Sequence, residues 1–511
     1  MQLSKENLAK INQQPGLSIP GHKVLELPEK VLQFGTGVLL RGLPDYFIDK
    51  ANKQGVFNGR IVVVKSTAKG GTDAFEKQDG LYTVCVRGIE EGNNIEEAII
   101  NASISRVLSA SEEWSKILEC AHNAELRLII SNTTEVGIVA SDDDIKQSPP
   151  PSFPGKLLAF LYERFKAFDG SAQSGMVIIP TELITDNGAK LKAIVQDLAQ
   201  KNKLGDAFIN WLNTSNDFCN SLVDRIVPGK LPPADTKLTE EKLGYTDELM
   251  IMAEPFRLWA IESPADDKRV KDVLSFASVD SGVVVAPDIE KFRELKLRLL
   301  NGTHTFSCGT ALLAGFMTVK EAMADEQFSA FVRRLMMQEI AMAMEGKIIS
   351  YNEACAFANK VTDRFRNPFL EHKWVSITMN YTSKMRMRNI PLLQQYYAKN
   401  AKVPAQMALG FAAYLVFMKC SKGADGKYYS EINGQSLPVD DESAGYYSEK
   451  WADNNANNVV DSVLANKDLW GADLSALAGF GQAVKENIEL IQSDGVMSVI
   501  SKGHYHQIIA E

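Results

Sequence analysis

Short apolar runs recur through the first half of the chain, and each is bounded by Gly, Pro, Ser or Asn. The clearest cover residues 31–34, 61–64, 127–130 and 176–179. Runs of this length, rich in Leu or β-branched residues, are typical of buried parallel strands. The segments between them, such as 111–123 and 189–202, carry helical periodicity. This alternation predicts a doubly wound α/β sheet, and residues 83–107 predict an inserted hairpin or additional strands.

The pattern changes after the apolar run at residues 283–285 and Pro287. From there to about residue 400 the spacing is mostly helical, with many Met and Ala residues. Residues 427–439 predict a small hairpin, after which helices resume. We therefore expect an α/β domain over residues 1–285 and a mainly α-helical domain over residues 286–511. A ligand is expected to bind in the cleft between the two.

The composition disfavours several classes of partner. The 511 residues are 45% hydrophobic and 23% charged, without low-complexity runs, as in ordinary globular proteins. The formal charge of -9 is spread along the chain without a basic stripe, which argues against nucleic-acid binding. The N-terminus lacks the apolar segment of a secretory signal, and no run approaches the roughly 18 apolar residues of a membrane span.

The six cysteines lie far apart, without a CxxC pair. This spacing argues against a structural zinc site and against a disulfide framework, and it favours a reduced, cytoplasmic protein. We expect a site without a metal ion. The sequence is compatible with a monomer or a small homo-oligomer.

Gly35 and Gly37 stand where the first predicted strand leads into a helix. A glycine pair at such a turn lets backbone amides approach a pyrophosphate, next to the positive end of the helix. Leu40 occupies the third glycine position of the GxGxxG pattern, so a plain tight turn explains the pair equally well. On the functional interpretation, the cofactor-binding segment consists of Gln33, Phe34, Gly35, Thr36, Gly37, Val38, Leu39, Leu40 and Arg41.

The second predicted strand ends at Lys65, where dinucleotide-binding domains usually carry an acidic residue for the ribose. Lys65 would suit a 2′-phosphate, so the residues alone leave NAD and NADP open. Polar residues also follow the third and fourth strands, and N-caps and turns would explain them. Because ligands bind at the carboxyl edge of an open α/β sheet, we also expect Asn132 and Thr133 to contact the cofactor, and Glu135 and Asn187 to take part in the reaction.

Lys296, Asn301 and His304 lie close together in one predicted helix. At 100° per residue, Asn301 lies about 140° and His304 about 80° from Lys296, so one broad face can present all three. A buried lysine can exchange protons near neutral pH, an amide can stabilise a developing oxyanion, and a histidine can orient a hydroxyl. A solvated lysine and a histidine in the core explain the same pattern without any catalytic role.

Eight segments carry a more specific signal. They read QFGTGVLLRGLPDYFIDKAN, QDGLYTVCVRG, SNTTEVGI, PTELITDNG, SLVDRIVPG, AEPFRLWAIE, KLRLLNGTHT, and RFRNPF followed by TSKMRMR. In this order they resemble the long-chain mannitol dehydrogenase family, the zinc-independent polyol and uronate oxidoreductases. The resemblance covers most of the chain from about residue 30 to about residue 390. It is most specific in KLRLLNGTHT, and it is strongest toward the tagaturonate-type members.

The resemblance implies an N-terminal Rossmann-type domain, a helical C-terminal domain and NAD as the cofactor. It also implies hydride transfer to a sugar acid, with D-tagaturonate reduced to D-altronate. The roles it implies are Lys296 as the acid/base, Asn301 and Asn187 as oxyanion donors, His304 as the group that orients the substrate, Glu135 in the proton path, and Asp224 and Lys384 as substrate contacts. For Asp224, an ion pair with Arg225 is the alternative.

Two departures from the family bear on the substrate. Polyol-specific members carry an arginine eight residues before Lys384, where this chain has Ser376. They also favour GxFHRAH after the glycines, where this chain has VLLRGL. The missing arginine disfavours a plain hexitol. We expect Arg386 to pair with a substrate carboxylate, with Arg388 and Arg366 as alternatives, because a guanidinium suits that group.

Other activities stay open at this point. Fructuronate (mannonate) or mannitol oxidoreduction would use the same catalytic residues. A non-catalytic sugar-acid sensor would not need the complete set of Lys296, Asn301 and His304. A metal-dependent dehydrogenase is disfavoured because the remaining histidines are scattered along the chain.

Overall fold

The structure is a computed structural model that describes residues 1–66, 71–133, 136–264, 267–453 and 455–508. It divides into two compact units. Unit 1 comprises Met1–Arg87 and Asn94–Ile289, and unit 2 comprises Gly88–Asn93 and Glu290–Glu511. Each unit is described separately below.

Unit 1 is built on a six-stranded parallel sheet. In spatial order its strands are β6 (Ile104–Ser109), β3 (Arg60–Lys65), β2 (Glu29–Phe34), β7 (Leu128–Ser131), β8 (Val177–Pro180) and β9 (Asp217–Phe218). Numbered along the chain this is the order 3-2-1-4-5-6 of a Rossmann sheet, which confirms the α/β prediction. The strand order reverses between β2 and β7, and ligands bind such folds at that point.

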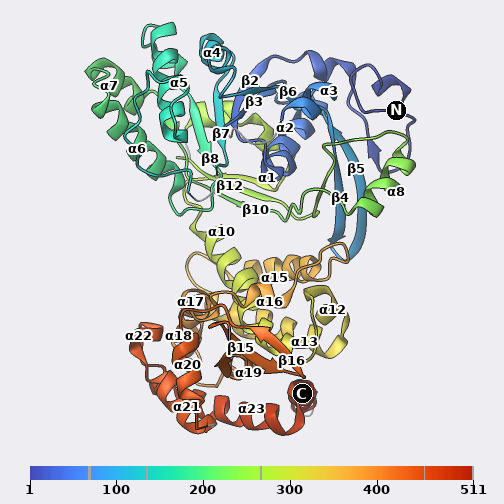
Figure 1. Ribbon diagram of the computed structural model, residues 1–511, viewed down its shortest axis with the longest axis vertical. Helices are drawn as coiled ribbons and strands as arrows, with labels where there is room; N and C mark the ends of the chain where they lie inside the picture. Colours follow the sequence, from blue (N-terminus) through green and yellow to red (C-terminus); the bar gives the residue numbers. More distant parts are fainter. Residues whose placement is uncertain (67–70, 134–135, 265–266, 454, 509–511) are drawn as a thin grey trace. The chain divides into compact units, whose positions relative to one another are not determined.

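Both faces of this sheet are apolar. Val31, Val63 and Ile130 point into one core, while Leu32 and Val62 point into the other, because successive side chains of a strand alternate in direction. The core that contains Leu32 and Val62 lies under α4 (Trp114–Glu119), α5 (Phe153–Ala167), α6 (Asn187–Lys201) and α7 (Asp206–Thr214) (Figure 1). The core that contains Val31 lies under α1 (Val38–Gly42) and α2 (Pro44–Lys53). The remaining helices of unit 1 are α3 (Asp73–Lys77), α8 (Pro233–Leu243) and α9 (Lys268–Val273).

Two smaller sheets complete unit 1, except that the tip of one β-hairpin (Gly88–Asn93) belongs to unit 2. One contains β1 (Leu17–Ser18), β5 (Asn93–Asn101), β4 (Tyr82–Glu90) and β11 (Ile251–Ala253), and the other contains β10 (Ser221–Asp224), β12 (Leu258–Glu262) and β13 (Val283–Ala286). The predicted hairpin is therefore confirmed: β4 and β5 are joined at Glu91 and Gly92, which both have positive φ, as a tight hairpin turn requires.

Unit 2 is mainly helical, as predicted. Its helices are α10 (Glu290–Leu295), α11 (Thr303–Leu313), α12 (Val319–Ala324), α13 (Glu326–Arg334), α14 (Ala341–Met344), α15 (Tyr351–Phe365), α16 (Trp374–Ile377), α17 (Tyr381–Lys384), α18 (Ile390–Tyr397), α19 (Ala405–Phe417), α20 (Ala444–Lys450), α21 (Ala456–Leu464), α22 (Lys467–Trp470), α23 (Phe480–Asp494) and α24 (Val496–Ile508). A small sheet of β14 (Cys420–Lys422), β15 (Tyr428–Ile432) and β16 (Gln435–Pro438) includes the predicted hairpin.

The buried helix α19 packs against α11 and α23. A side chain at Gly410 would place its Cβ 2.7 Å from the carbonyl oxygen of Phe306 in α11. Glycine at this position therefore lets the backbones of α11 and α19 approach closely. This contact holds α11, the helix that carries His304, against the centre of unit 2.

Three segments of unit 2 are π-helical rather than α-helical: η6 (Lys296–Gly302), η7 (Leu335–Ile340) and η8 (Met385–Asn389). The predicted placement of Lys296 and Asn301 about 140° apart is therefore wrong, because it assumed α-helical winding through η6. A π-helix bonds residue i to residue i+5, and such segments occur frequently at functional sites. The segments η6 and η8 pack against each other.

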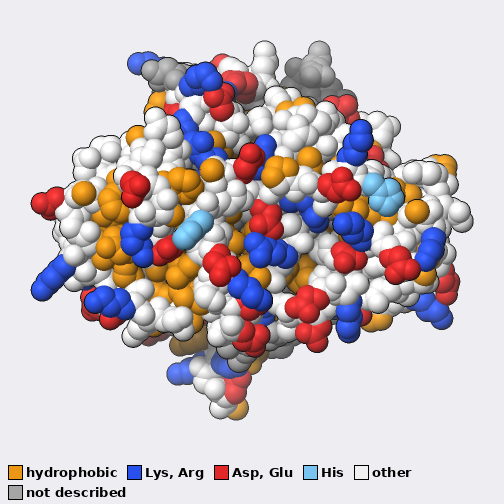
Figure 2. Space-filling view, turned by 90° about the horizontal axis from the view of Figure 1, so that it is seen from above, with side chains coloured by type: hydrophobic (Ala, Val, Ile, Leu, Met, Phe, Trp, Pro, Cys, Tyr) orange, Lys and Arg blue, Asp and Glu red, His pale blue; other side chains and the backbone are white. Residues whose placement is uncertain are grey.

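Within the described residues, no helix combines the length and the apolar content needed to cross a membrane. On the face shown in Figure 2, basic and acidic side chains are intermingled rather than gathered by sign.

Candidate functional site

The loop after β2 has the geometry of a phosphate cradle. Gly35 has a φ of 129°, and a Cβ there would lie 3.0 Å from the carbonyl oxygen of Asn132 and 2.9 Å from Cδ1 of Leu40. Only glycine fits this close approach between the ends of β2 and β7. No described atom lies within 4 Å of a Cβ built at Gly37. The backbone just before α1 therefore borders open space, as a pyrophosphate requires.

Two residues predicted to bind the cofactor, Gln33 and Arg41, form hydrogen bonds that hold this loop in place. The Gln33 side chain is fully buried, and its Nε2 donates to the carbonyl oxygen of Gly35 at 3.4 Å. Arg41 is also buried, and its guanidinium donates to the carbonyl oxygens of Thr36 (3.4 Å) and Leu249 (2.6 Å). These contacts turn both side chains toward the protein. They hold the loop in position.

The other predicted cofactor residues differ in exposure. Phe34 and Leu40 are fully buried, whereas Thr36, Val38 and Leu39 are half-buried. The predicted helix after the loop is interrupted: α1 ends at Gly42, and α2 begins at Pro44. Proline cannot donate the backbone hydrogen bond of a continuous helix, which explains the break.

Lys65, Asn132 and Thr133 lie at the carboxyl edge of the sheet. Lys65 is the last residue of β3 and is buried. Asn132 follows β7, and its Nδ2 donates to the carbonyl oxygen (3.1 Å) and the Oγ1 (3.0 Å) of Thr181, after β8. These bonds join the ends of two strands next to the point where the strand order reverses. Glu135, predicted in the proton path, lies outside the described residues.

Glu182 is a residue of this edge that the sequence interpretation did not single out. Its Oε1 accepts hydrogen bonds from the backbone N (2.9 Å) and the Oγ1 (3.0 Å) of Thr133, and its Oε2 accepts from Ser131 Oγ (3.1 Å). Burial raises the pKa of this carboxyl, although the three hydrogen bonds oppose the shift. The sequence signal that could have identified Glu182 is the PTE motif directly after the fourth predicted strand.

Asn187 is buried and fully engaged. Its Nδ2 donates to the carbonyl oxygens of Pro180 (3.0 Å), Glu182 (3.0 Å) and Ser221 (3.1 Å), and its Oδ1 accepts from the backbone N of Gly188 and Ser221. Both amide hydrogens already have acceptors inside unit 1. In this geometry Asn187 ties α6 to β8 and β10, and it offers no free donor to an oxyanion.

The other two residues of the DNG motif, Asp186 and Gly188, are also explained by the local backbone structure. Asp186 adopts a left-handed conformation (φ 56°), which Asp tolerates better than most residues. A Cβ at Gly188 would lie 2.5 Å from the backbone carbonyl group of Cys219. The motif therefore forms a tight joint at the start of α6.

Asp224 is the last residue of β10 and is buried. Its neighbour Arg225 donates from Nε to the carbonyl oxygen of Glu254 (2.8 Å) and from Nη1 to that of Gly42 (2.7 Å). The guanidinium of Arg225 also lies over the ring of Tyr46, 4.4 Å from its centroid. Arg225 thus links three segments of unit 1.

In unit 2, Lys296 and Asn301 both lie in η6, five residues apart, and both are half-buried. Five residues is the hydrogen-bonding span of a π-helix, so the two lie closer to one face than α-helical winding allows. The carbonyl oxygen of Asn301 accepts from Thr305 Oγ1 at 2.8 Å.

Arg298 connects the two π-helical segments. Its side chain is buried, and its Nη1 donates to the carbonyl oxygens of Met387 and Arg388 in η8, both at 2.8 Å. Its Nε pairs with Glu294 at 3.0 Å. The guanidinium of Arg298 therefore holds η8 against η6, which fixes Arg388 relative to Asn301.

The ring of His304 is held by aromatic neighbours. It stacks on Phe365 with centroids 4.1 Å apart, and it meets His372 (5.1 Å) and Trp374 (5.9 Å) edge-on. Its Nε2 is buried and has no hydrogen-bond partner among the described residues. Burial lowers the pKa of His304 well below its usual range, and His372, Arg364, Arg388 and Lys384 lower it further. His304 is therefore a neutral ring with an unused polar atom, ready for a ligand.

Lys384 and Arg388 join this cluster, whereas Arg386 does not. Lys384 Nζ donates to the carbonyl oxygen of Ile377 at 2.9 Å, and burial and then Arg388 lower its pKa. Arg388 Nη1 donates to Thr305 Oγ1 at 3.1 Å. Arg386 is exposed and donates to the carbonyl oxygen of Asp468 at 3.3 Å. The structure thus brings Lys296, Asn301, His304 and Lys384 into one region of unit 2, with Arg388 in place of Arg386.

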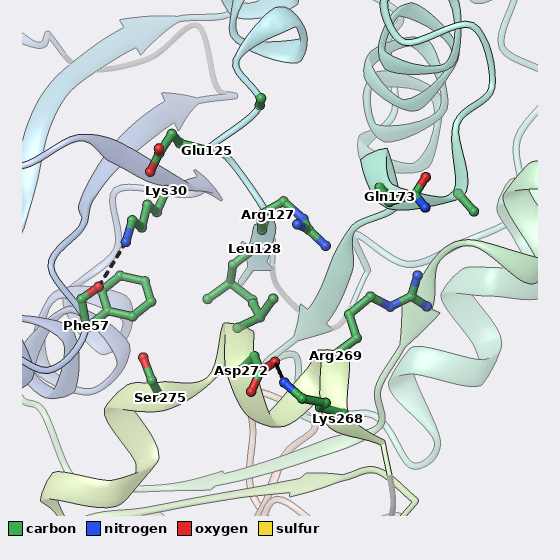
Figure 3. Close-up of a pocket in the computed structure, with 13 residues that line it drawn as sticks. Lys30, Phe57, Glu125, Arg127, Leu128, Gln173, Lys268, Arg269, Asp272 and Ser275 are labelled. Atoms are coloured by element: carbon green, nitrogen blue, oxygen red, sulfur yellow. Dashed lines mark hydrogen bonds and ion pairs between the residues drawn. The ribbon is translucent and has the colours of Figure 1, made fainter.

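A separate cavity of about 810 Å³ lies at the opposite, amino edge of the sheet in unit 1 (Figure 3). Four cations line it, and each already has a protein partner: Lys30 with the Phe57 carbonyl oxygen, Arg127 with that of Gly175, Lys268 with Asp272, and Arg269 with Asp217. Open α/β sheets bind ligands at the carboxyl edge. This cavity is therefore distinct from the candidate cofactor site.

No group of three or more His, Cys, Asp or Glu side chains that could hold a metal ion occurs in the part of the chain that the structure describes.

A Rossmann sheet with a phosphate loop at its switch point, followed by a helical unit that carries a Lys-Asn-His set, defines the class as a dehydrogenase. Comparison with known families agrees. Residues 29–271 match the Mannitol dehydrogenase Rossmann domain, and residues 288–492 match the Mannitol dehydrogenase C-terminal domain. The chain belongs to the mannitol dehydrogenase family, which confirms the resemblance inferred from the eight segments.

Curated relatives match over almost the whole length. Altronate oxidoreductase of Halalkalibacterium halodurans is 37% identical over 492 residues, which cover 94% of each chain. Altronate oxidoreductase of Bacillus subtilis is 35% identical over 480 residues, which cover 93% of this chain and 95% of the relative.

Solved structures show the same fold. Mannitol 2-dehydrogenase of Pseudomonas fluorescens, solved with NAD and D-mannitol, matches with a TM-score of 0.66 and 20% identity over 98% of this chain and 99% of that one. A D-sorbitol dehydrogenase in substrate-free form matches with a TM-score of 0.76 and 18% identity over 98% of this chain and 100% of that one.

Proposed function

We propose that this chain is an NAD-dependent oxidoreductase that reversibly reduces D-tagaturonate to D-altronate. The observation that carries the proposal is the match to altronate oxidoreductases at 35–37% identity along nearly the full length of both partners. Whole-length similarity of this kind includes both the cofactor unit and the unit that carries the Lys-Asn-His set. Because fold alone does not define a substrate, the residues of each unit must also fit the reaction.

Unit 1 fits a dinucleotide. The open space beside Gly37 and the backbone of the loop would take the pyrophosphate, with Gly35 allowing the close contact of β2 and β7. Bound NADH would supply the hydride. The mannitol 2-dehydrogenase of similar fold was solved with NAD, and NAD rather than NADP is proposed here despite Lys65.

Unit 2 supplies the groups for proton transfer. In reduction, the Lys296 ammonium gives its proton to the carbonyl oxygen of the substrate as the hydride arrives at carbon. The amide of Asn301 donates a hydrogen bond to the same oxygen as it gains charge. His304 Nε2, which has no described protein partner, holds a neighbouring hydroxyl. In oxidation the uncharged amine of Lys296 accepts the proton. No metal ion takes part in this scheme.

The six cysteines are all free thiols, which suits the reducing cytoplasm that we propose as the location. The partner is a small sugar-acid substrate.

The test is oxidation of NADH by the purified protein, followed by absorbance, with EDTA present and with D-tagaturonate and D-fructuronate in parallel. Rapid oxidation with D-tagaturonate alone supports the proposal. Preference for D-fructuronate would keep the mechanism and assign the sister activity. No oxidation with either substrate, despite measurable NADH binding, would contradict the proposed function. NADPH in place of NADH under the same conditions tests the choice of cofactor.

A further inference from the structure

Unit 2 gathers several cations around His304. Lys384 and Arg388 lie close enough to the imidazole to disfavour its protonation, and His372 meets its ring edge-on at 5.1 Å. Arg388 in turn lowers the pKa of Lys384, after the larger effect of burial. Like charges gathered in a half-buried region destabilise each other unless an anion joins them.

The neighbouring carboxylates are already engaged. Glu294 pairs with Arg298, and the Oδ2 of Asp441 accepts from the backbone N of Thr382 at 2.7 Å. Among the described residues, no carboxylate forms an ion pair with Lys384 or Arg388. Asp441 offsets part of the charge on Lys384, but because no described carboxylate forms an ion pair with Lys384 or Arg388, the cluster keeps positive charge.

Arg388 is held in a defined position within this cluster. Its backbone carbonyl oxygen accepts from Arg298, and its Nη1 donates to Thr305 Oγ1. Thr305 follows His304 in α11 and donates to the carbonyl oxygen of Asn301. The hydroxyl of Thr305 therefore links Arg388 to Asn301, the proposed oxyanion donor. The Nε and Nη2 donors of Arg388 have no described partner.

We propose that Arg388, with Lys384 beside it, forms a carboxylate-binding subsite that holds the acid end of the substrate. This inference rests on the proposed function and adds the residue that selects a sugar acid over a neutral sugar. A guanidinium binds a carboxylate through two parallel hydrogen bonds.

The other two arginines considered from the sequence are placed differently. Arg386 is exposed, two residues earlier in η8, and bonds to the carbonyl oxygen of Asp468. Arg366 is exposed and donates from Nη2 to Ser329 Oγ at 3.0 Å. Neither forms a described hydrogen bond with Thr305, and neither is among the main influences on the pKa of His304.

The experiment compares Arg388→Gln with Arg386→Gln, using a substrate with the carboxylate and one without it. D-Tagaturonate and D-tagatose differ in that D-tagatose carries a CH₂OH group in place of the carboxylate. Binding of D-altronate, measured by calorimetry, gives a second readout that does not depend on turnover. The thermal midpoint of each variant shows whether it is folded.

For Arg388→Gln we expect kcat/KM with D-tagaturonate to fall about 100-fold or more, because truncating one partner of a buried charge pair is costly. The Kd for D-altronate should rise by a similar factor, while kcat/KM with D-tagatose should change less than about threefold. An unchanged Kd for D-altronate, an equal loss with both sugars, or the specific loss in Arg386→Gln instead would overturn the inference. Failure of the wild type to reduce D-tagaturonate would contradict the proposed function, and the Kd for D-altronate would then decide the subsite separately.

Discussion

Asn187 and Ser221 exchange two hydrogen bonds. The side-chain Nδ2 of Asn187 donates to the carbonyl oxygen of Ser221 at 3.1 Å, and the backbone N of Ser221 donates to Asn187 Oδ1 at 2.9 Å. The amide thereby imitates the paired bonds between neighbouring antiparallel strands. It joins the first residue of α6 to the first residue of β10 inside the buried core of unit 1.

Asn187→Ala should therefore act mainly on stability. It leaves several buried carbonyl and amide groups without partners, and each costs about 1–3 kcal/mol. We expect a clearly lower thermal midpoint for Asn187→Ala. Asn301→Ala, in the half-buried η6, should keep the midpoint close to the wild type and lose turnover instead. If Asn187→Ala kept full stability and lost only kcat, a direct catalytic role for Asn187 would be supported.

Lys296→Met should remove the proton donor. We expect kcat to fall by about 100- to 10,000-fold, the range for the loss of a general acid, while the Kd of NADH stays within about twofold. Single-turnover rates and fluorescence titration of NADH measure the two quantities. Lys291→Met is the matched control, because Lys291 lies five residues earlier, in α10, and pairs with Glu353 at 2.9 Å. Comparable rates in the two variants would rule out Lys296 as the acid.

The two glycines of the loop should respond differently to alanine. Gly35→Ala introduces a Cβ that would lie 3.0 Å from the backbone of Asn132 at a positive φ, so both the thermal midpoint and NADH affinity should fall. Gly37→Ala is conformationally permitted at φ −62° and meets no described atom, so the midpoint should hold. Its methyl group would still occupy the space assigned to the pyrophosphate, and NADH affinity should fall about tenfold. An unchanged affinity in Gly37→Ala would place the cofactor elsewhere.

Asp45 predicts a pH effect on stability. Burial raises the pKa of its carboxyl to about 7, against 3.8 in the unfolded chain. Between these values the folded protein keeps a proton that the unfolded chain releases, so this contribution to stability is lost as pH rises through that window.

Because asparagine does not ionise, the Asp45→Asn variant should not lose this contribution to stability as pH rises. Relative to the wild type, it should gain stability between about pH 4 and about pH 7, with an upper bound of about 4 kcal/mol. Thermal midpoints of both proteins across this range provide the measurement. Parallel curves would show that Asp45 does not titrate in this way.

Much of the fold could be predicted because the sheet of unit 1 is buried on both faces. Strands such as β2 and β3 therefore read as continuous apolar runs with sharp ends. Gly35 and Gly37 could be predicted for the same reason, since they follow such a run directly.

The rest depends on contacts that local patterns do not contain. Glu182 becomes a buried carboxyl because Thr133 and Ser131 reach it from the neighbouring strand. Arg386 and Arg388 are two residues apart in η8, so their different surroundings follow from helix winding and not from composition. Apolar spacing near Lys296 is compatible with an α-helix, and only the backbone shows the π-helical turn.

The π-helical winding of η6 makes the number of residues in this segment important. An α-helix rotates 100° per residue, so loss of one residue from the seven of Lys296–Gly302 would let the segment return to α-helical winding. Because a π-helical turn holds about one residue more than an α-helical turn, α11 and His304 would then keep roughly their orientation, and the wider turn that brings Lys296 and Asn301 toward one face would be lost. Point substitutions in this stretch test single groups, whereas a one-residue deletion would change the placement of Lys296 relative to Asn301 without replacing either side chain. In this enzyme family, the number of residues between the lysine and the histidine is therefore expected to tolerate change less than the identities of the apolar residues between them.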